Sequence, residues 1–172
     1  THLWRNQEKL PLGNPYHNGH EKIAEPLESE SDYTERWSSG TYSCDVMRDA
    51  AVEFIHEHAD RPFFLYYPSL IPHVAIQVPD EETDAYPHEW DTEHYLGQKG
   101  YLPHARPNAA YAGMISRLDR EIGQLMDALE QEGIADDTII IVTSDNGTTW
   151  AGGVDAEFFD STGPWRGLKG SL

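Results

Sequence analysis

Asp145 and Asn146 are the first candidates for chemistry in this sequence, because they place two hard oxygen donors directly after the apolar run from Ile139 to Val142. Such a run predicts a strand buried on both faces, as in parallel sheets. Ligands of open α/β sheets bind outside the carboxyl ends of the strands, and these donors suit a divalent cation, most naturally calcium. The same residue types also cap ordinary turns, so both interpretations stay open at this point.

His73 is the second candidate, and it follows another apolar run, residues 63–67. This run is apolar or aromatic on both faces, which predicts a second buried strand. If the two strands are parallel, His73 lies on the same edge of the sheet as Asp145, and the preceding Pro72 restrains it. That position favours a functional histidine over a structural one.

Lys169 is the third candidate, in a Gly/Trp-rich loop near the end of the sequence. Gly167 and Gly170 frame it, and glycines let the backbone approach a ligand closely. A lysine held there would present a fixed positive charge to an anion. The alternative is an ordinary surface lysine.

Two helices and two strands are predicted to position these candidates. The first helix runs from Thr41 to the Arg61-Pro62 pair, and the second from Asn108 to about Glu132, each with apolar residues at helical spacing. Helix, strand, loop, helix and strand is the order of an α/β sheet built from crossovers.

The remaining segments carry histidines, acids and a cysteine without the spacing of a site. Residues 1–40 are polar and irregular, and His17 and His20 there are more typical of a solvated loop than of metal ligands. Residues 79–107 form a long loop, rich in proline, acidic and aromatic residues, which we expect to border the substrate. Cys44 has no histidine base at a meaningful spacing and is interpreted as a small apolar residue.

Charge and composition exclude several classes of partner. The 172 residues carry 12 basic and 30 acidic side chains, a net charge of −18, which argues against nucleic acid and anionic membranes. No apolar run approaches the about 20 residues of a membrane span, and a single cysteine excludes an internal disulfide framework. The sequence starts without a methionine and stops after a glycine-rich segment, so we expect an internal piece of a longer domain.

Three segments of the chain, taken together and in order, carry a family resemblance. They are Thr41-Tyr42-Ser43 through Asp60-Arg61-Pro62-Phe63-Phe64-Leu65-Tyr66 to Pro72-His73, then Tyr111 through Leu118-Asp119-Arg120 and Gly133-Ile134-Ala135-Asp136-Asp137-Thr138 into Thr143-Ser144-Asp145-Asn146-Gly147, and finally Arg166-Gly167-Leu168-Lys169-Gly170-Ser171-Leu172. This set resembles the type I sulfatases, within the alkaline-phosphatase-like superfamily. The resemblance implies an α/β fold, with residues 1–172 forming part of one catalytic domain whose mixed, mostly parallel sheet is flanked by helices.

The resemblance also implies a role for each candidate. Asp145 and Asn146 would be two of the ligands of an active-site calcium, His73 would hydrogen-bond the sulfate ester near its leaving-group oxygen, and Lys169 would contact the sulfate oxygens. These roles suit sulfate ester hydrolysis, which needs cations and donors around the sulfate oxygens and a proton donor for the departing alcohol. A location outside the cytoplasm, whether periplasmic, secreted or lysosomal, is implied as well.

Part of the family's machinery has no counterpart in this sequence. The family makes its nucleophile, formylglycine, from a Cys or Ser in a Cys/Ser-x-Pro-x-Arg type motif, whereas Cys44 is followed by Asp-Val-Met-Arg. The family's N-terminal aspartate pair, which supplies further calcium ligands, is not found either. We therefore expect the formylglycine to lie in a preceding part of the protein. The piece by itself is expected to be inactive and to self-associate through an exposed sheet edge.

Two other classes of function stay open from the sequence. A phosphodiesterase or phosphatase of the same superfamily would commonly use two zinc ions with histidine ligands, to which the amide oxygen of Asn146 is less suited than to calcium. A non-enzymatic acidic binding module is the other alternative. The nucleophile motif would separate the first two classes, and calcium binding through Asp145 would separate both from the third.

Overall fold

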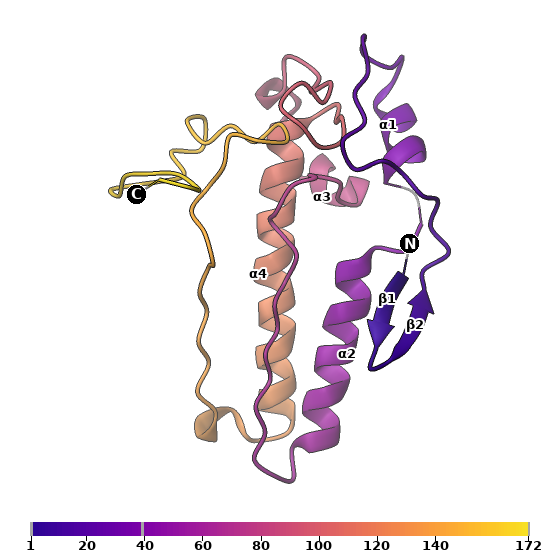
Figure 1. Ribbon diagram of the computed structural model, residues 1–172. Coiled ribbons are helices and arrows are strands. Elements are labelled where there is room, and N and C mark those ends of the chain that lie inside the picture. Colours follow the sequence, from indigo (N-terminus) through magenta and orange to yellow (C-terminus); the bar gives the residue numbers. More distant parts are fainter. Residues whose placement is uncertain (1, 39, 172) are drawn as a thin grey trace.

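The structure, a computed structural model, describes residues 2–38 and 40–171. Its centre is a pair of helices, α2 (Ser43–His58) and α4 (Pro107–Gln131), which run side by side in the same direction (Figure 1). Both predicted helices are thereby confirmed. Apolar residues pack together at the lower end of the pair, where buried Ile55 of α2 contacts buried Ala128 and Leu129 of α4.

The end of α4 follows its sequence signals. Gly133 has a φ of 71°, a conformation that glycine adopts without steric cost. The N–H of Ile134 then donates to the carbonyl of Leu129, and the Ile134 side chain packs on the cluster at the lower end of the helix pair. A short 3₁₀ turn, η2 (Ala135–Asp137), reverses the chain.

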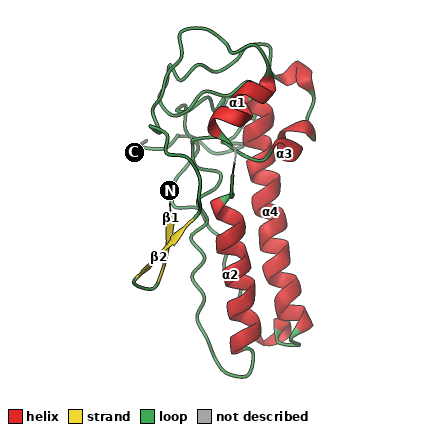
Figure 2. Ribbon diagram, turned by 90° about the vertical axis from the view of Figure 1, so that its right-hand side faces the viewer, coloured by secondary structure: helices red, strands yellow, loops and turns green. Residues whose placement is uncertain are grey.

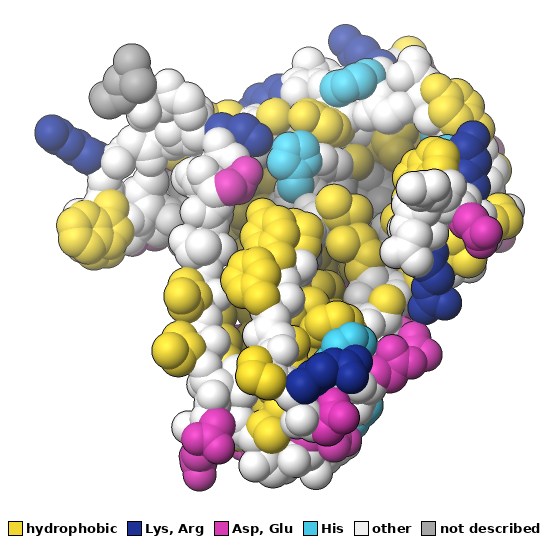
Figure 3. All heavy atoms as spheres, turned by 60° about the horizontal axis from the view of Figure 1, so that its bottom comes forward, with side chains coloured by type: hydrophobic (Ala, Val, Ile, Leu, Met, Phe, Trp, Pro, Cys, Tyr) yellow, Lys and Arg dark blue, Asp and Glu magenta, His cyan; other side chains and the backbone are white. Residues whose placement is uncertain are grey.

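Each helix is followed by a segment that runs back along α4 in the opposite direction (Figure 1). These segments, residues 63–70 and 139–146, contain the two predicted strands, but neither forms a strand in the structure. The prediction of strands buried on both faces is therefore wrong for this chain. Phe64, Tyr66 and Ile139 are 87%, 75% and 89% exposed. Figure 3 shows one face of the molecule, on which hydrophobic side chains gather.

The physical reason is the lack of neighbours for hydrogen bonding. A strand exists through its ladder of backbone hydrogen bonds, and the described structure pairs neither segment with another. Residues 63–70 nevertheless keep the alternation of a strand, since Phe63, Leu65 and Tyr67 are half-buried and the residues between them are exposed. The segment thus has one face on the helices and one face free.

The sheet within the described residues is a two-stranded antiparallel hairpin, so the predicted mostly parallel sheet is not observed. Its strands are β1 (His2–Arg5) and β2 (Glu8–Pro11), with Leu3 opposite Leu10. This hairpin lies beside α2 (Figure 1). It corrects the interpretation of residues 1–40 as irregular, as does the helix α1 (Glu30–Trp37), which Ser29 caps in a reciprocal box with Asp32.

The predicted long loop, residues 79–107, also contains short helices. They are α3 (Asp80–Asp84) and the 3₁₀ turn η1 (His88–Trp90), and the loop folds over the upper end of α4 with α1 beside it (Figures 1 and 2). A second apolar cluster lies there, where Val74, Met114 and Val154 are buried together. Through this cluster, the loops that follow the two extended segments pack against α4.

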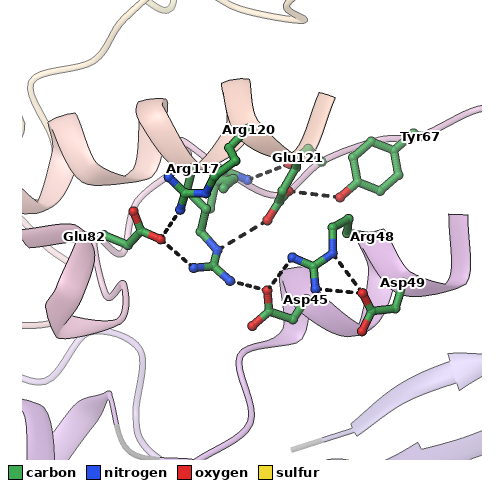
Figure 4. Close-up of polar contacts among 10 residues, drawn as sticks. Asp45, Arg48, Asp49, Tyr67, Glu82, Arg117, Arg120 and Glu121 are labelled. Atoms are coloured by element: carbon green, nitrogen blue, oxygen red, sulfur yellow. Dashed lines mark hydrogen bonds and ion pairs between the residues drawn. The ribbon is translucent and has the colours of Figure 1, made fainter. Parts of the chain in front are cut away.

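Buried charges join α2, α3 and α4 in an ion-pair network (Figure 4). Arg117 of α4 is 7% exposed and pairs with Asp45 of α2 and, at 2.7 Å, with Glu82 of α3. Its Nε lies 3.4 Å from a carboxylate oxygen of Glu121, which is 1% exposed. The other oxygen of Glu121 accepts a hydrogen bond from the hydroxyl of Tyr67, at 3.1 Å. Burial raises the pKa of the Glu121 carboxyl above its usual range.

None of the described helices is long and apolar enough to cross a membrane.

Candidate functional site

The loop that carries Lys169 makes backbone contacts with the turn that follows Asp145 and Asn146. The N–H of Lys169 donates to the carbonyl of Thr148, at 2.7 Å. A Cβ placed on Gly147 would lie 3.6 Å from the backbone nitrogen of Lys169, an ordinary van der Waals distance. The Gly/Trp-rich loop is therefore seated on the turn that directly follows Asp145 and Asn146.

His73 reaches the same end of the molecule from the other extended segment. Its neighbour Val74 lies under Gly152, where an added Cβ would come within 2.6 Å of the Val74 side chain. Gly152 has a φ of 63°, so glycine is required there for conformation and for space. Residues 147–153 thus link the Lys169 loop on one side to the His73 turn on the other.

The imidazole of His73 is exposed, and one ring nitrogen has a fixed partner. Nδ1 hydrogen-bonds the carbonyl of Val74, an acceptor, so Nδ1 carries a proton. Nε2 is then the nitrogen available to a ligand, as in histidines that transfer protons. Asp145, Asn146 and Lys169 are exposed as well.

The oxygen donors fit calcium in kind but not in number. Calcium takes about 6–8 oxygen ligands, of which the Asp145 carboxylate and the Asn146 amide supply a small part. Among the residues that the structure describes, no group of three or more His, Cys, Asp or Glu side chains is placed to hold a metal ion. A complete metal shell at this turn needs ligands from outside these residues.

Tyr101 lies next to His73, with His20 on Tyr101, and neither residue is marked as a site by the sequence. The ring centroids of Tyr101 and His73 lie 5.9 Å apart in an edge-to-face arrangement, and those of Tyr101 and His20 lie 4.9 Å apart. No motif marks these residues. The only available signal was the long loop 79–107, which contains Tyr101 and was expected to border the substrate.

Cys44 lies in the apolar cluster at the upper end of α4, together with Val74 and Val154. It is 2% exposed, and burial raises the pKa of its thiol, with the Glu121 carboxylate adding to the effect. A raised pKa disfavours the reactive thiolate. The structure therefore agrees with the interpretation of Cys44 as a small buried residue.

This end of the molecule carries oxygen donors, a histidine and a lysine on separate loops. That is the composition expected of a hydrolase for anionic esters. The family model for sulfatases matches residues 1–165. The chain therefore belongs to the sulfatase family.

Several known proteins are similar to this chain. It is 30% identical over 148 residues to a sulfatase of Formosa agariphila, covering 80% of this chain and 25% of that protein. An N-acetylgalactosamine-6-O-sulfatase of Bacteroides thetaiotaomicron is 29% identical over 67% of this chain and 19% of its own length. Human arylsulfatase H is 24% identical over 74% of this chain and 17% of its own length.

Among solved structures, the chain resembles the crystal structure of Ps i-CgsB in complex with k-i-k-neocarrahexaose. The TM-score is 0.53 at 29% sequence identity, over 66% of this chain and 23% of that one. In each of these comparisons the chain matches a quarter or less of the relative's length.

Proposed function

We propose that the whole protein hydrolyses a sulfate ester, and that this chain contributes the calcium ligands Asp145 and Asn146 and the substrate contacts His73 and Lys169. The contact of the Lys169 loop with Gly147 is the observation that carries the proposal. It brings the backbone of the Lys169 loop against the turn that follows the two oxygen donors. A sulfate group held at a bound cation needs an additional positive charge on its remaining oxygens.

Each residue has a separate part in this proposal. Asp145 and Asn146 hold part of the calcium shell, and a bound calcium neutralises charge on the sulfate oxygens. Lys169 contacts those oxygens from the facing loop. His73 hydrogen-bonds the ester near the leaving group, and its Nε2 in the protonated form donates a proton to the departing alcohol oxygen. The nucleophile, formylglycine, belongs to a part of the protein outside these residues.

Family membership supports the same proposal. The substrate is a sulfate ester, and the names of two relatives, an N-acetylgalactosamine-6-O-sulfatase and an arylsulfatase, span sugar and aryl esters. We propose an extracytoplasmic location, as is common in the family.

Calcium titration and sulfate release by the whole protein test this proposal together. We expect release of inorganic sulfate from 4-nitrophenyl sulfate or sugar sulfates. Asp145→Ala should weaken calcium binding at least roughly tenfold, because losing even an outer partner of a ligand costs about that much. Asp137→Ala is the matched control, since this exposed aspartate lies in η2, just before the same extended segment and at its far end. Hydrolysis of phosphate diesters alone would favour the rival enzyme class, and calcium binding independent of Asp145 would contradict the metal assignment.

The 172-residue chain on its own gives a separate prediction. We expect no sulfatase activity and only weak calcium binding, because two donors satisfy a small part of a shell of about 6–8 ligands. We also expect self-association through the unpaired segments 63–70 and 139–146, whose exposed apolar side chains and free backbone groups can pair with another copy. Light scattering, calcium calorimetry and an aryl sulfate assay examine the three claims. A monodisperse monomer that binds calcium tightly would contradict them.

A further inference from the structure

Tyr101 has a left-handed backbone conformation that contacts with neighbouring residues stabilise. Its φ is 66°, which is uncommon for a residue with a bulky side chain. Three contacts hold it there: its N–H donates to His20 Nδ1 at 3.2 Å, its ring lies against the ring of His20, and it packs on the apolar cluster around Val74 and Met114. Such conformations cost energy and concentrate at ligand sites.

The same contacts leave two polar atoms available to a ligand. Because His20 Nδ1 accepts a hydrogen bond, the proton of the neutral ring lies on Nε2, and the exposed imidazole can donate it outward. The hydroxyl of Tyr101 makes no hydrogen bond within the described residues, and the ring is only half-buried. An aromatic ring with a donor beside it thus stands next to His73.

We propose that Tyr101 and His20 determine substrate specificity by binding the sugar ring of a sulfated carbohydrate, next to the ester that His73 contacts. The inference rests on the proposed sulfatase function. A sugar offers C–H groups that pack on an aromatic ring, and hydroxyls around its edge that accept from His20 Nε2. An aryl leaving group offers a flat apolar ring, with no hydroxyl to accept from His20 Nε2 or to pair with the Tyr101 hydroxyl.

The contact of Tyr101 with His73 decides which part of the substrate the pair meets. His73 is assigned to the leaving-group oxygen, so the group attached to that oxygen lies beside the His73 ring. Tyr101 contacts His73 directly, and residues 79–107 supply it from a loop outside the extended segments. Calcium ligands and Lys169 bind the sulfate, whereas Tyr101 and His20 bind the sugar ring.

Steady-state kinetics of the whole protein test this assignment. The probes are the methyl glycosides of galactose 6-sulfate, glucose 6-sulfate and N-acetylgalactosamine 6-sulfate, with inorganic sulfate as an inhibitor that has no ring. Tyr101→Gly removes the ring and keeps the positive φ without steric cost. We expect KM for the best glycoside to rise roughly tenfold, the size of a good aromatic contact, with kcat and the inhibition constant of sulfate within about threefold of wild type.

Two further variants separate recognition from folding. Tyr101→Phe keeps the ring and should retain KM to within about threefold, since only the hydroxyl is lost. Tyr16→Gly removes a tyrosine that is 86% exposed elsewhere in the N-terminal segment, and should leave all constants unchanged. An active enzyme in which Tyr101→Gly leaves KM unchanged, or raises KM and the sulfate inhibition constant equally, overturns the assignment. A wild-type enzyme that hydrolyses aryl sulfates but no sugar sulfate overturns it as well. A wild-type protein that hydrolyses no sulfate ester at all overturns the proposed function itself.

Discussion

Replacing His73 with alanine in the whole enzyme is expected to lower kcat roughly 10²–10⁴-fold, the usual range for losing a positioned acid or base. The expected cause is the loss of the proton that Nε2 donates to the departing alcohol. The fold should survive, because the imidazole is exposed and the residue follows the extended segment rather than packing inside it. Turnover of a sulfate ester, together with the thermal midpoint, measures both expectations.

The leaving group provides a sharper test of the role of His73. An ester with an acidic phenol as its alcohol needs little protonation, so His73→Ala should lose far less activity on 4-nitrophenyl sulfate than on an alkyl or sugar sulfate. His88→Ala is the control, since this exposed histidine of the long loop lies outside the candidate site and pairs with Glu30, at 3.4 Å. Equal losses on both esters, or nearly normal turnover on each, would return His73 to a structural role.

Arg117→Met is expected to lower the free energy of unfolding by about 3–5 kcal/mol, the usual cost of removing one partner from a buried ion pair. The variant leaves the buried carboxylates of Glu82 and Glu121, and the partly exposed one of Asp45, without their shared cation. Urea denaturation measures the loss. Arg120→Met is the matched control: this arginine also contacts Glu82, but its side chain is 54% exposed, so the loss should stay below about 1 kcal/mol.

The pH dependence of the Arg117→Met variant identifies the carboxylate responsible. Burial already raises the pKa of Glu121, and loss of the guanidinium raises it further. The folded state then keeps a proton that the unfolded state releases. The free energy of unfolding therefore falls as the pH rises from the pKa of Glu121 in the unfolded state to its raised pKa in the folded state. We expect the loss to be larger at pH 8 than at pH 5. A loss that does not change with pH would show that Glu121 is not the group left unpaired.

Helices were predictable from this sequence because their signals are local. The limits of α4 follow from apolar spacing and from Gly133, which ends the helix as expected. The buried charges of α4 were not predicted. Arg117 and Glu121 have the spacing of an exposed i, i+4 pair, and only the arrival of α2 and α3 makes them interior. The reciprocal cap of Ser29 and Asp32 did mark α1 in the sequence, and it was overlooked.

Strands were less predictable, because a strand depends on partners that its own residues do not specify. Residues 63–67 have the composition of a buried strand, yet the described chain offers them helices on one face and no neighbour at either edge. For the site, order along the chain indicated that His73 and Asp145 would meet at one end. The contact between His20 and Tyr101 of the long loop joins residues 81 positions apart, which no local pattern encodes.

The ion-pair network also joins positions that are far apart along the chain. Arg117 is 72 residues from Asp45 and 35 from Glu82, and Tyr67 is 54 from Glu121. Contacts of this separation require large loops to close, so they form after the local helical turns. Interactions made late raise the barrier to unfolding and have little effect on the rate of folding. In kinetic terms, we therefore expect the network to set how long the helix pair stays folded rather than how fast it forms.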